Sequence, residues 1–153
     1  MVTAIPWACA LLAAWVVPGW AMRTGRRRAI AAGALLAAAG GIAMSASGSA
    51  PLALFALCVA AAGFIGVQPV FWSLATEEWT GVAAAGAIAL INSFGALGGF
   101  LAPNLRLWSE RGLALPGAGG CVLAGTTVAG AALFLLIRPR PSASDRSAEP
   151  FPN

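Results

Sequence analysis

The sequence predicts an all-α membrane protein, and three observations support this fold class. Of the 153 residues, 59% are hydrophobic and only 9% are charged, whereas soluble domains typically carry about 25% charged residues. Apolar stretches of roughly 20 residues, the length that crosses a bilayer, recur along the chain. Charged residues lie almost entirely between or after these stretches. Because a backbone in lipid must satisfy its hydrogen bonds internally, we expect the stretches to be transmembrane helices.

Five stretches qualify as membrane spans. In order, they cover residues of about 2–22, 29–46, 51–74, 82–103 and 117–137. The first has its arginines after the apolar residues and not before them, so we interpret it as a span and not as a signal peptide. The second is the shortest. We expect residues 1–137 to form the membrane region, and the Pro- and Ser-rich residues 138–153 to form a disordered cytoplasmic tail.

The distribution of arginine predicts the orientation in the membrane. All nine basic residues are Arg; four follow the first span and three follow the last. With five spans these two groups lie on the same side, which the positive-inside rule assigns to the cytoplasm. We therefore expect a multi-pass protein of a bacterial inner membrane, with its N-terminus outside and its C-terminus in the cytoplasm. This asymmetry explains the net charge of +4, so we expect no nucleic acid partner.

The chain contains few of the residue types that act as nucleophiles or bases in catalysis. The chain has no His, Lys or Tyr, and it lacks a nucleophile and base arrangement, so we expect no enzyme activity. Cys9, Cys58 and Cys121 lie within apolar stretches and lack metal-ligand spacing. We interpret them as small buried hydrophobic residues, and we expect neither a metal nor a cofactor.

Two segments carry family motifs. The first loop reads GWAMRTGRRR, in which Arg23, Gly25, Arg26 and Arg27 resemble the short cytoplasmic loop motif of the major facilitator superfamily. Pro18 and Met22 depart from this motif, which has Gly and Asp at those places. Residues 68–103 resemble helices ten and eleven of the anion:cation symporter branch of that superfamily. The matching positions are Phe71, Trp72, Ile88, Ala89, Leu90, Ile91, Asn92, Ser93, Gly95, Leu97, Gly98, Gly99, Phe100 and Pro103.

The resemblance implies that the chain corresponds to helices eight to twelve of a twelve-helix carrier, a partial C-terminal half of a major facilitator fold. It implies secondary active transport of organic anions such as sugar acids, dicarboxylates or aromatic acids, with proton coupling in a full-length form. In that branch the N-terminal half holds the arginine that grips the substrate and the carboxylates that carry the proton. No acidic residue lies deep within the five spans, so a proton relay has no site here. We expect no transport by this chain alone: either a partner chain supplies the other helices, including the N-terminal half, or the chain is a truncated gene product.

Four residues are candidates for substrate binding: Asn92, Trp72, Gln68 and Ser93. An unpaired amide in lipid costs several kcal/mol, so Asn92 needs a partner. The residues alone slightly favour an interhelical hydrogen bond, worth on the order of 1 kcal/mol; the resemblance favours a place in the substrate cavity. Gln68 and Trp72 are four residues apart and share one helix face, which suits a ligand cavity. A tryptophan at the membrane interface is the alternative.

Gly95 and Gly99 form a small-xxx-small pair, which predicts close packing of a neighbouring helix. Glu77 and Glu78 form either a solvated helix end or an ion pair with the arginines of the first loop, which would close a cytoplasmic gate. The expected partners are a small organic anion, the lipid bilayer and a chain with the missing helices. The alternative function is a small polytopic membrane protein that binds or regulates other membrane proteins through glycine-rich helix faces.

Overall fold

The computed structural model describes residues 4–45, 49–77, 79, 81–113 and 117–136. This part of the chain forms five α-helices and contains no strand. They are α1 (Ala4–Thr24), α2 (Arg27–Met44), α3 (Ala50–Glu77), α4 (Gly81–Leu113) and α5 (Ala118–Leu136). All five are long and apolar enough to cross a membrane, so the predicted all-α membrane fold is confirmed. The predicted tail, residues 138–153, lies outside the described residues.

The helix α4 continues well beyond residue 103, where we expected its membrane span to end, and stops only at Leu113. Its last turns carry polar residues, and Arg106 Nε donates to Glu110 Oε1 at 3.0 Å. Charge pairs at this four-residue spacing stabilise a helix. The prediction concerned the part of the helix in lipid, and the helix itself continues into a polar segment.

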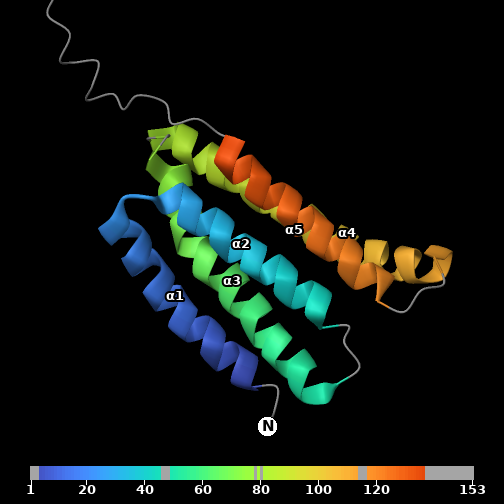
Figure 1. Ribbon diagram of the computed structural model, residues 1–153. Coiled ribbons are helices and arrows are strands. Elements are labelled where there is room, and N and C mark those ends of the chain that lie inside the picture. Colours follow the sequence, from blue (N-terminus) through green and yellow to red (C-terminus); the bar gives the residue numbers. More distant parts are fainter. Residues whose placement is uncertain (1–3, 46–48, 78, 80, 114–116, 137–153) are drawn as a thin grey trace, which may run out of the picture.

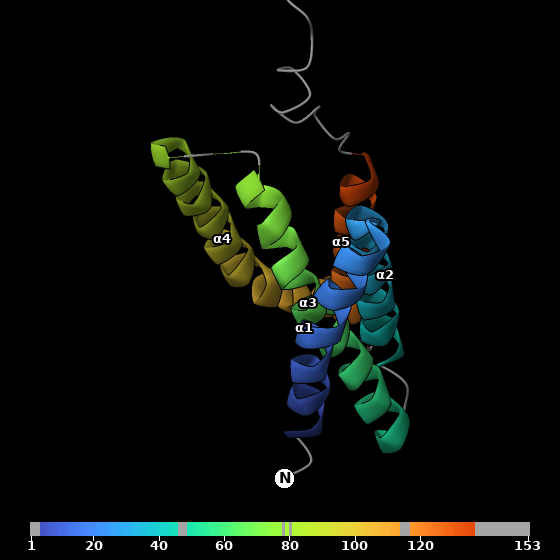
Figure 2. The same ribbon diagram turned by 90° about the vertical axis from the view of Figure 1, so that its left-hand side faces the viewer.

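The five helices alternate in direction along the chain and lie side by side (Figure 1). The helix α3 packs against both α1 and α2, α2 also packs against α5, and α5 packs against α4. At its N-terminal end α4 leans away from the other four helices, as Figure 2 shows. The bundle is therefore a group of three helices, α1 to α3, extended sideways by α5 and then by α4.

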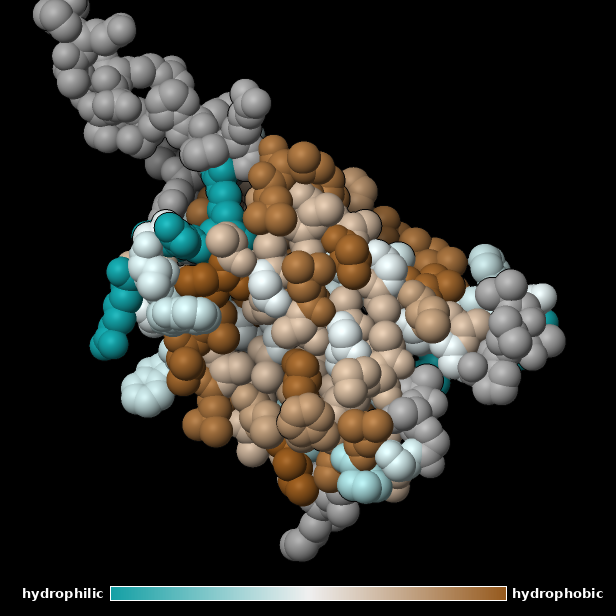
Figure 3. All heavy atoms as spheres, in the orientation of Figure 1, coloured by the Kyte–Doolittle hydropathy of each residue, from teal (hydrophilic) through white to brown (hydrophobic). Residues whose placement is uncertain are grey.

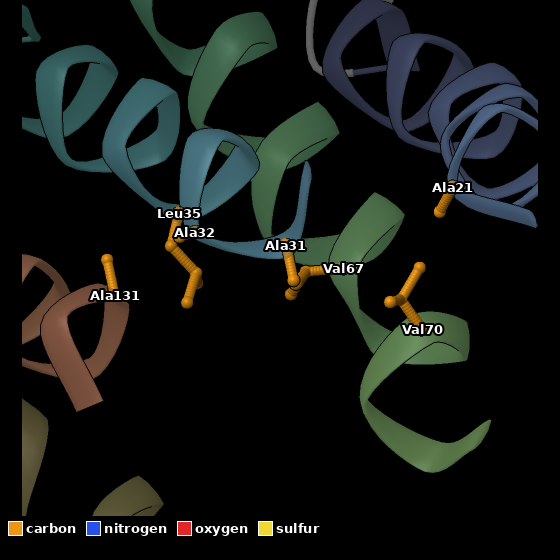
Figure 4. Close-up of a cluster of buried hydrophobic side chains, with 7 residues drawn as sticks. All are labelled: Ala21, Ala31, Ala32, Leu35, Val67, Val70 and Ala131. Atoms are coloured by element: carbon orange, nitrogen blue, oxygen red, sulfur yellow. The ribbon is translucent and has the colours of Figure 1, made fainter. Parts of the chain in front are cut away.

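The buried side chains are small. Figure 4 shows the central cluster, which joins α1, α2, α3 and α5 and contains Ala21, Ala31, Ala32, Leu35, Val67, Val70 and Ala131. Lipid tails are as apolar as leucine, so burying large side chains gains little in a membrane, and close van der Waals packing takes over. Large apolar side chains accordingly point outward. In Figure 3 the face over α2 and α5 is mostly apolar to neutral, and hydrophilic residues gather toward the ends of the helices.

Two glycines set the distance between α2 and α3. A Cβ added to Gly63 on α3 would clash with the carbonyl oxygen of Ala34 and lie 2.8 Å from the Ala38 Cβ. A Cβ added to Gly41 on α2 would lie 2.5 Å from the carbonyl oxygen of Ala56. Real Cβ atoms do not approach other atoms this closely. The two backbones are therefore in direct contact, which is the usual geometry of small-residue helix pairs in membranes.

The turn between α1 and α2 depends on Gly25. Its φ is +66°, in the left-handed region, where a Cβ costs roughly 1–2 kcal/mol. The next residue, Arg26, precedes the first turn of α2, and its carbonyl accepts a hydrogen bond from the Ile30 N–H at 3.1 Å. Glycine thus allows the chain to reverse direction within two residues.

Replacing Gly63 with Ala should lower the free energy of unfolding by about 1–3 kcal/mol, since the added methyl meets backbone that cannot move aside. The matched control is Gly33→Ala on α2, where a Cβ meets nothing within 4 Å. Thermal unfolding of the purified chain in mild detergent, followed with a thiol-reactive dye, measures both. Equal midpoints for the two variants would contradict the close contact of α2 and α3.

Replacing Gly25 with Val should destabilise the chain by about 1–2 kcal/mol, because a β-branched residue adopts a positive φ poorly. Gly25→Asn is the control, since asparagine tolerates this region through its short polar side chain. The same dye assay compares them. A Gly25→Val variant as stable as Gly25→Asn would show that the turn does not need a left-handed residue.

Candidate functional site

The helix α4 is the most exposed element of the bundle. None of the residues described in its span is buried, and its only extensive contact in the described part of the chain is with α5. Asn92 lies in the middle of the apolar part of α4, between Leu90 and Phe94, which are 62% and 71% exposed. Asn92, a candidate for substrate binding, therefore lies on an open face of the molecule.

Asn92 and Ser93 differ in how their polar atoms are satisfied. The Ser93 hydroxyl donates to the Ala89 carbonyl of its own helix at 2.9 Å. Its hydrogen-bond donor is therefore satisfied even in an apolar environment. The Asn92 side chain is exposed. Within the described residues its amide has no hydrogen-bond partner. Of the two, only Asn92 has N–H donors that remain available to a ligand or another helix.

Gly95 and Gly99 also lie on the open surface of α4. A Cβ added at either position, or at Gly98 between them, would meet nothing within 4 Å. The described part of the chain holds its closest glycine contacts elsewhere, at Gly41, Gly63, Gly66 and Gly119. Close packing against Gly95 and Gly99 stays a prediction, and its occupant would have to come from outside the described residues.

On α3, Trp72 is half-buried and Gln68 is exposed. The indole of Trp72 packs edge-on against the Phe71 ring, with centroids 5.5 Å apart, and Phe71 packs in the same way against Phe134 of α5 at 6.0 Å. This aromatic row fixes the orientation of Trp72 and connects α3 to α5. Aromatic pairs in such edge-to-face geometry stabilise by about 0.5–1.5 kcal/mol beyond the area they bury.

The structure does not pack the two groups of candidates against each other. The helices α3 and α4 have no extensive contact in the described part of the chain, and their ribbons diverge toward the N-terminal end of α4 (Figure 2). Gln68 and Trp72 therefore lie on one element, and Asn92 and Ser93 on another. A ligand that touches both would have to lie between these helices.

The loop motif residues form the turn described above. Arg23 is in the last turn of α1, Gly25 and Arg26 make the reversal, and Arg27 opens α2. Arg23 and Arg26 are exposed, and Arg27 is half-buried. Of the proposed gate pair, Glu78 lies outside the described residues and Glu77 ends α3, so the predicted ion pair to this turn stays untested.

A cavity of about 390 Å³ lies at the opposite end of the bundle, where α2 ends and α5 begins. It is lined by Ile42, Ser45, Leu57, Arg106, Glu110, Gly117, Gly120 and Leu123. None of the sequence candidates lines it. Its charged groups, Arg106 and Glu110, pair with each other, so the cavity offers no unbalanced positive charge to an anion. The Arg106–Glu110 spacing was visible in the sequence, but the cavity depends on contacts between helices far apart in the chain.

Two of the three cysteines lie on helices that pack against each other, α1 and α3. Cys9 on α1 and Cys58 on α3 are half-buried, and Cys121 on α5 is exposed. The expectation that all three are buried is therefore wrong for Cys121. No signal in the sequence pairs Cys9 with Cys58, because the register of α1 against α3 is set by tertiary contacts.

Comparison with known proteins shows that the chain is similar to bacterial transport proteins. No protein-family model matches it, and no solved structure matches it. It is 47% identical over 138 residues to the "Inner membrane transport protein RhmT" of Escherichia coli K12, which covers 90% of this chain and 32% of that protein.

Two further relatives are proteins of Agrobacterium vitis, each named "Putative tartrate transporter". One is 37% identical over 108 residues, or 70% of this chain and 24% of that protein. The other is 34% identical over 116 residues, or 75% and 27%. The chain thus spans about a third or less of the length of the curated relatives it matches. The predicted relationship to transporters is confirmed: the chain is homologous to one segment of these bacterial transport proteins.

Proposed function

We propose that this chain is the C-terminal part of a secondary active transporter of organic anions, located in the bacterial inner membrane. The observation that carries the proposal is the 47% identity over nine-tenths of the chain to an inner membrane transport protein. Two relatives whose names specify tartrate support a hydroxylated dicarboxylate or a similar acid as the substrate. The major facilitator resemblance of residues 68–103 agrees with both.

The open face of α4 supports a role as one wall of the substrate cavity. An amide in lipid without a hydrogen-bond partner costs several kcal/mol, and Asn92 is exposed in the middle of α4. The cost disappears if that face lines a polar cavity in the complete carrier. There the Asn92 amide N–H can donate to a substrate carboxylate or hydroxyl, and Gln68 and Trp72 can complete the contact from α3.

The same geometry supports the view that the chain does not transport alone. Alternating access needs two groups of helices that rock around a site near the bilayer midplane. Five helices supply one wall, and their spans carry no deeply placed Asp or Glu for proton transfer. We therefore assign the proton-carrying groups and the group that grips the substrate carboxylate to helices outside this chain, on the same polypeptide or on a partner chain.

A chimera tests the proposal. In one Agrobacterium vitis relative, the segment that this chain matches is replaced by the residues of this chain, and uptake of labelled tartrate is measured in cells and in proteoliposomes. We expect uptake by the chimera and none by this chain reconstituted alone. Asn92→Ala in the chimera should reduce uptake at least tenfold, which corresponds to a loss of about 1.4 kcal/mol or more in the transition state of transport.

The matched control for Asn92→Ala is Leu90→Ala, which truncates an exposed apolar side chain on the opposite side of the same helix turn. It should leave uptake within twofold, and both variants should reach the membrane in equal amounts. Equal uptake by the Asn92 and Leu90 variants would show that Asn92 does not bind substrate and would favour an interhelical hydrogen bond instead. Tartrate uptake by the isolated chain would contradict the assignment of the remaining machinery to other helices.

The predicted orientation gives an independent test. Green fluorescent protein fused after Asn153 should fluoresce, since it folds only in the cytoplasm, and alkaline phosphatase at the same place should be inactive. Replacing Arg26, Arg27 and Arg28 together with Gln removes most of the positive charge beside the first turn and should reduce this preference. Active phosphatase in the unmodified fusion would show that the C-terminus faces the periplasm.

The alternative function, a small membrane protein that binds others, is favoured by one observation. Gly95, Gly98 and Gly99 are open to a neighbouring helix, and such faces drive helix association in membranes. In the proposed carrier, we expect its other helices to cover the glycines of this face. A chimera that inserts and folds but transports nothing, together with stable binding of this chain to another membrane protein through Gly95 and Gly99, would favour the alternative.

A further inference from the structure

The contact between α1 and α3 is a seam of small residues with a fixed register. On α1 the residues Cys9, Ala13 and Val17 follow one another at four-residue spacing, so they share one helix face. On α3, Cys58 and Gly66 are eight residues apart, which is twice this spacing, so they also share one helix face. A Cβ added to Gly66 would lie 3.0 Å from Val17 Cγ2 and 3.3 Å from the Ala13 Cβ. The two faces therefore meet directly.

This register brings the two cysteines to nearly the same height. Gly66 lies beside the midpoint of Ala13 and Val17, and α1 and α3 run in the same direction (Figure 1). At about 1.5 Å per residue, Cys58 lies about 12 Å below Gly66, and Cys9 about 9 Å below that midpoint. The difference of about 3 Å is within the reach of two side chains. The two thiols lie close enough to influence each other.

We propose that Cys9 and Cys58 form a redox-sensitive thiol pair that closes to an intramolecular disulfide between α1 and α3. Each thiol loses its proton and one electron, an S–S bond forms, and a two-electron oxidant takes up both electrons. A membrane-soluble quinone fits this role, because it accepts two electrons and two protons to become a quinol. The inference stands on the α1–α3 contact and does not depend on the proposed transport function.

The position of the pair suits such an oxidant. Cys9 lies near the start of α1 and Cys58 lies in the first third of α3, at the end of these helices away from the arginine turn. With the predicted orientation, that end faces the periplasm, the compartment in which disulfides form and persist. Both residues are half-buried in an apolar seam, so a reagent that enters the membrane is needed.

Cys121 provides an internal control within the chain. It lies on α5 and is exposed, and α5 packs against α2 and α4. It has no cysteine opposite it among the described residues. Its thiol should therefore stay reduced when the other two form a disulfide.

The experiment uses the complete 153-residue chain in proteoliposomes, treated with a small molar excess of iodine. Iodine enters the bilayer and converts two thiols to one disulfide and two molecules of hydrogen iodide. After quenching and denaturation, free thiols are labelled with N-ethylmaleimide and counted by intact mass. We expect the number of labels to fall from three to one. Reduction with dithiothreitol should restore three, and chymotryptic peptides from α1 and α3 should be linked.

A matched variant keeps the number of thiols and moves one of them. Leu12 is 64% exposed on α1, away from the seam, so Cys9→Ala combined with Leu12→Cys should keep all three labels under the same treatment. Three labels in the unmodified chain, a linked peptide that contains Cys121, covalent dimers in place of the internal link, or equal loss of labels in the matched variant would each overturn the proposal.

Discussion

The direct contact between the backbones of α2 and α3 is the interaction on which the rest of the bundle depends. Lipid gives no hydrophobic drive for helices to associate, so stability must come from atoms that touch. Gly41 and Gly63 let the two backbones meet, and the buried alanines around them add many short contacts. The other sides of the same two helices then receive α1, at Gly66, and α5.

In α4, by contrast, the glycines make no close contact with another helix of the described chain. Its polar side chains divide into two kinds. Hydroxyl groups such as that of Ser93 return their hydrogen bond to their own helix. An asparagine amide in mid-helix has more donors and acceptors than its own backbone can satisfy. Asn92 is thus the group on α4 that most needs something beyond these five helices.

Much of the fold could be predicted from the sequence, because apolar length and backbone hydrogen bonding leave helices as the solution in lipid. The pairing of helices could not. Small-residue spacing pointed to Gly95 and Gly99, whereas the contacts described occur at Gly41, Gly63 and Gly66. Small-xxx-small spacing says that a face can be approached closely, not which helix approaches it. For the same reason the sequence did not show that Cys9 and Cys58 lie on neighbouring helices. The substrate roles of Asn92, Gln68 and Trp72 stay predictions, since they concern groups outside the chain.

The order in which helices are attached has a consequence for how the molecule opens. In the described chain, α4 is held mainly through α5, and α5 mainly through α2, while α1, α2 and α3 contact one another. The free energy of local unfolding is lower for a segment that makes few buried contacts with the rest of the protein. Amides of α4 should therefore exchange with solvent hydrogen through local openings that leave α1 to α3 intact. The described chain thus combines a closely connected three-helix base with one helix, α4, that is attached at its edge.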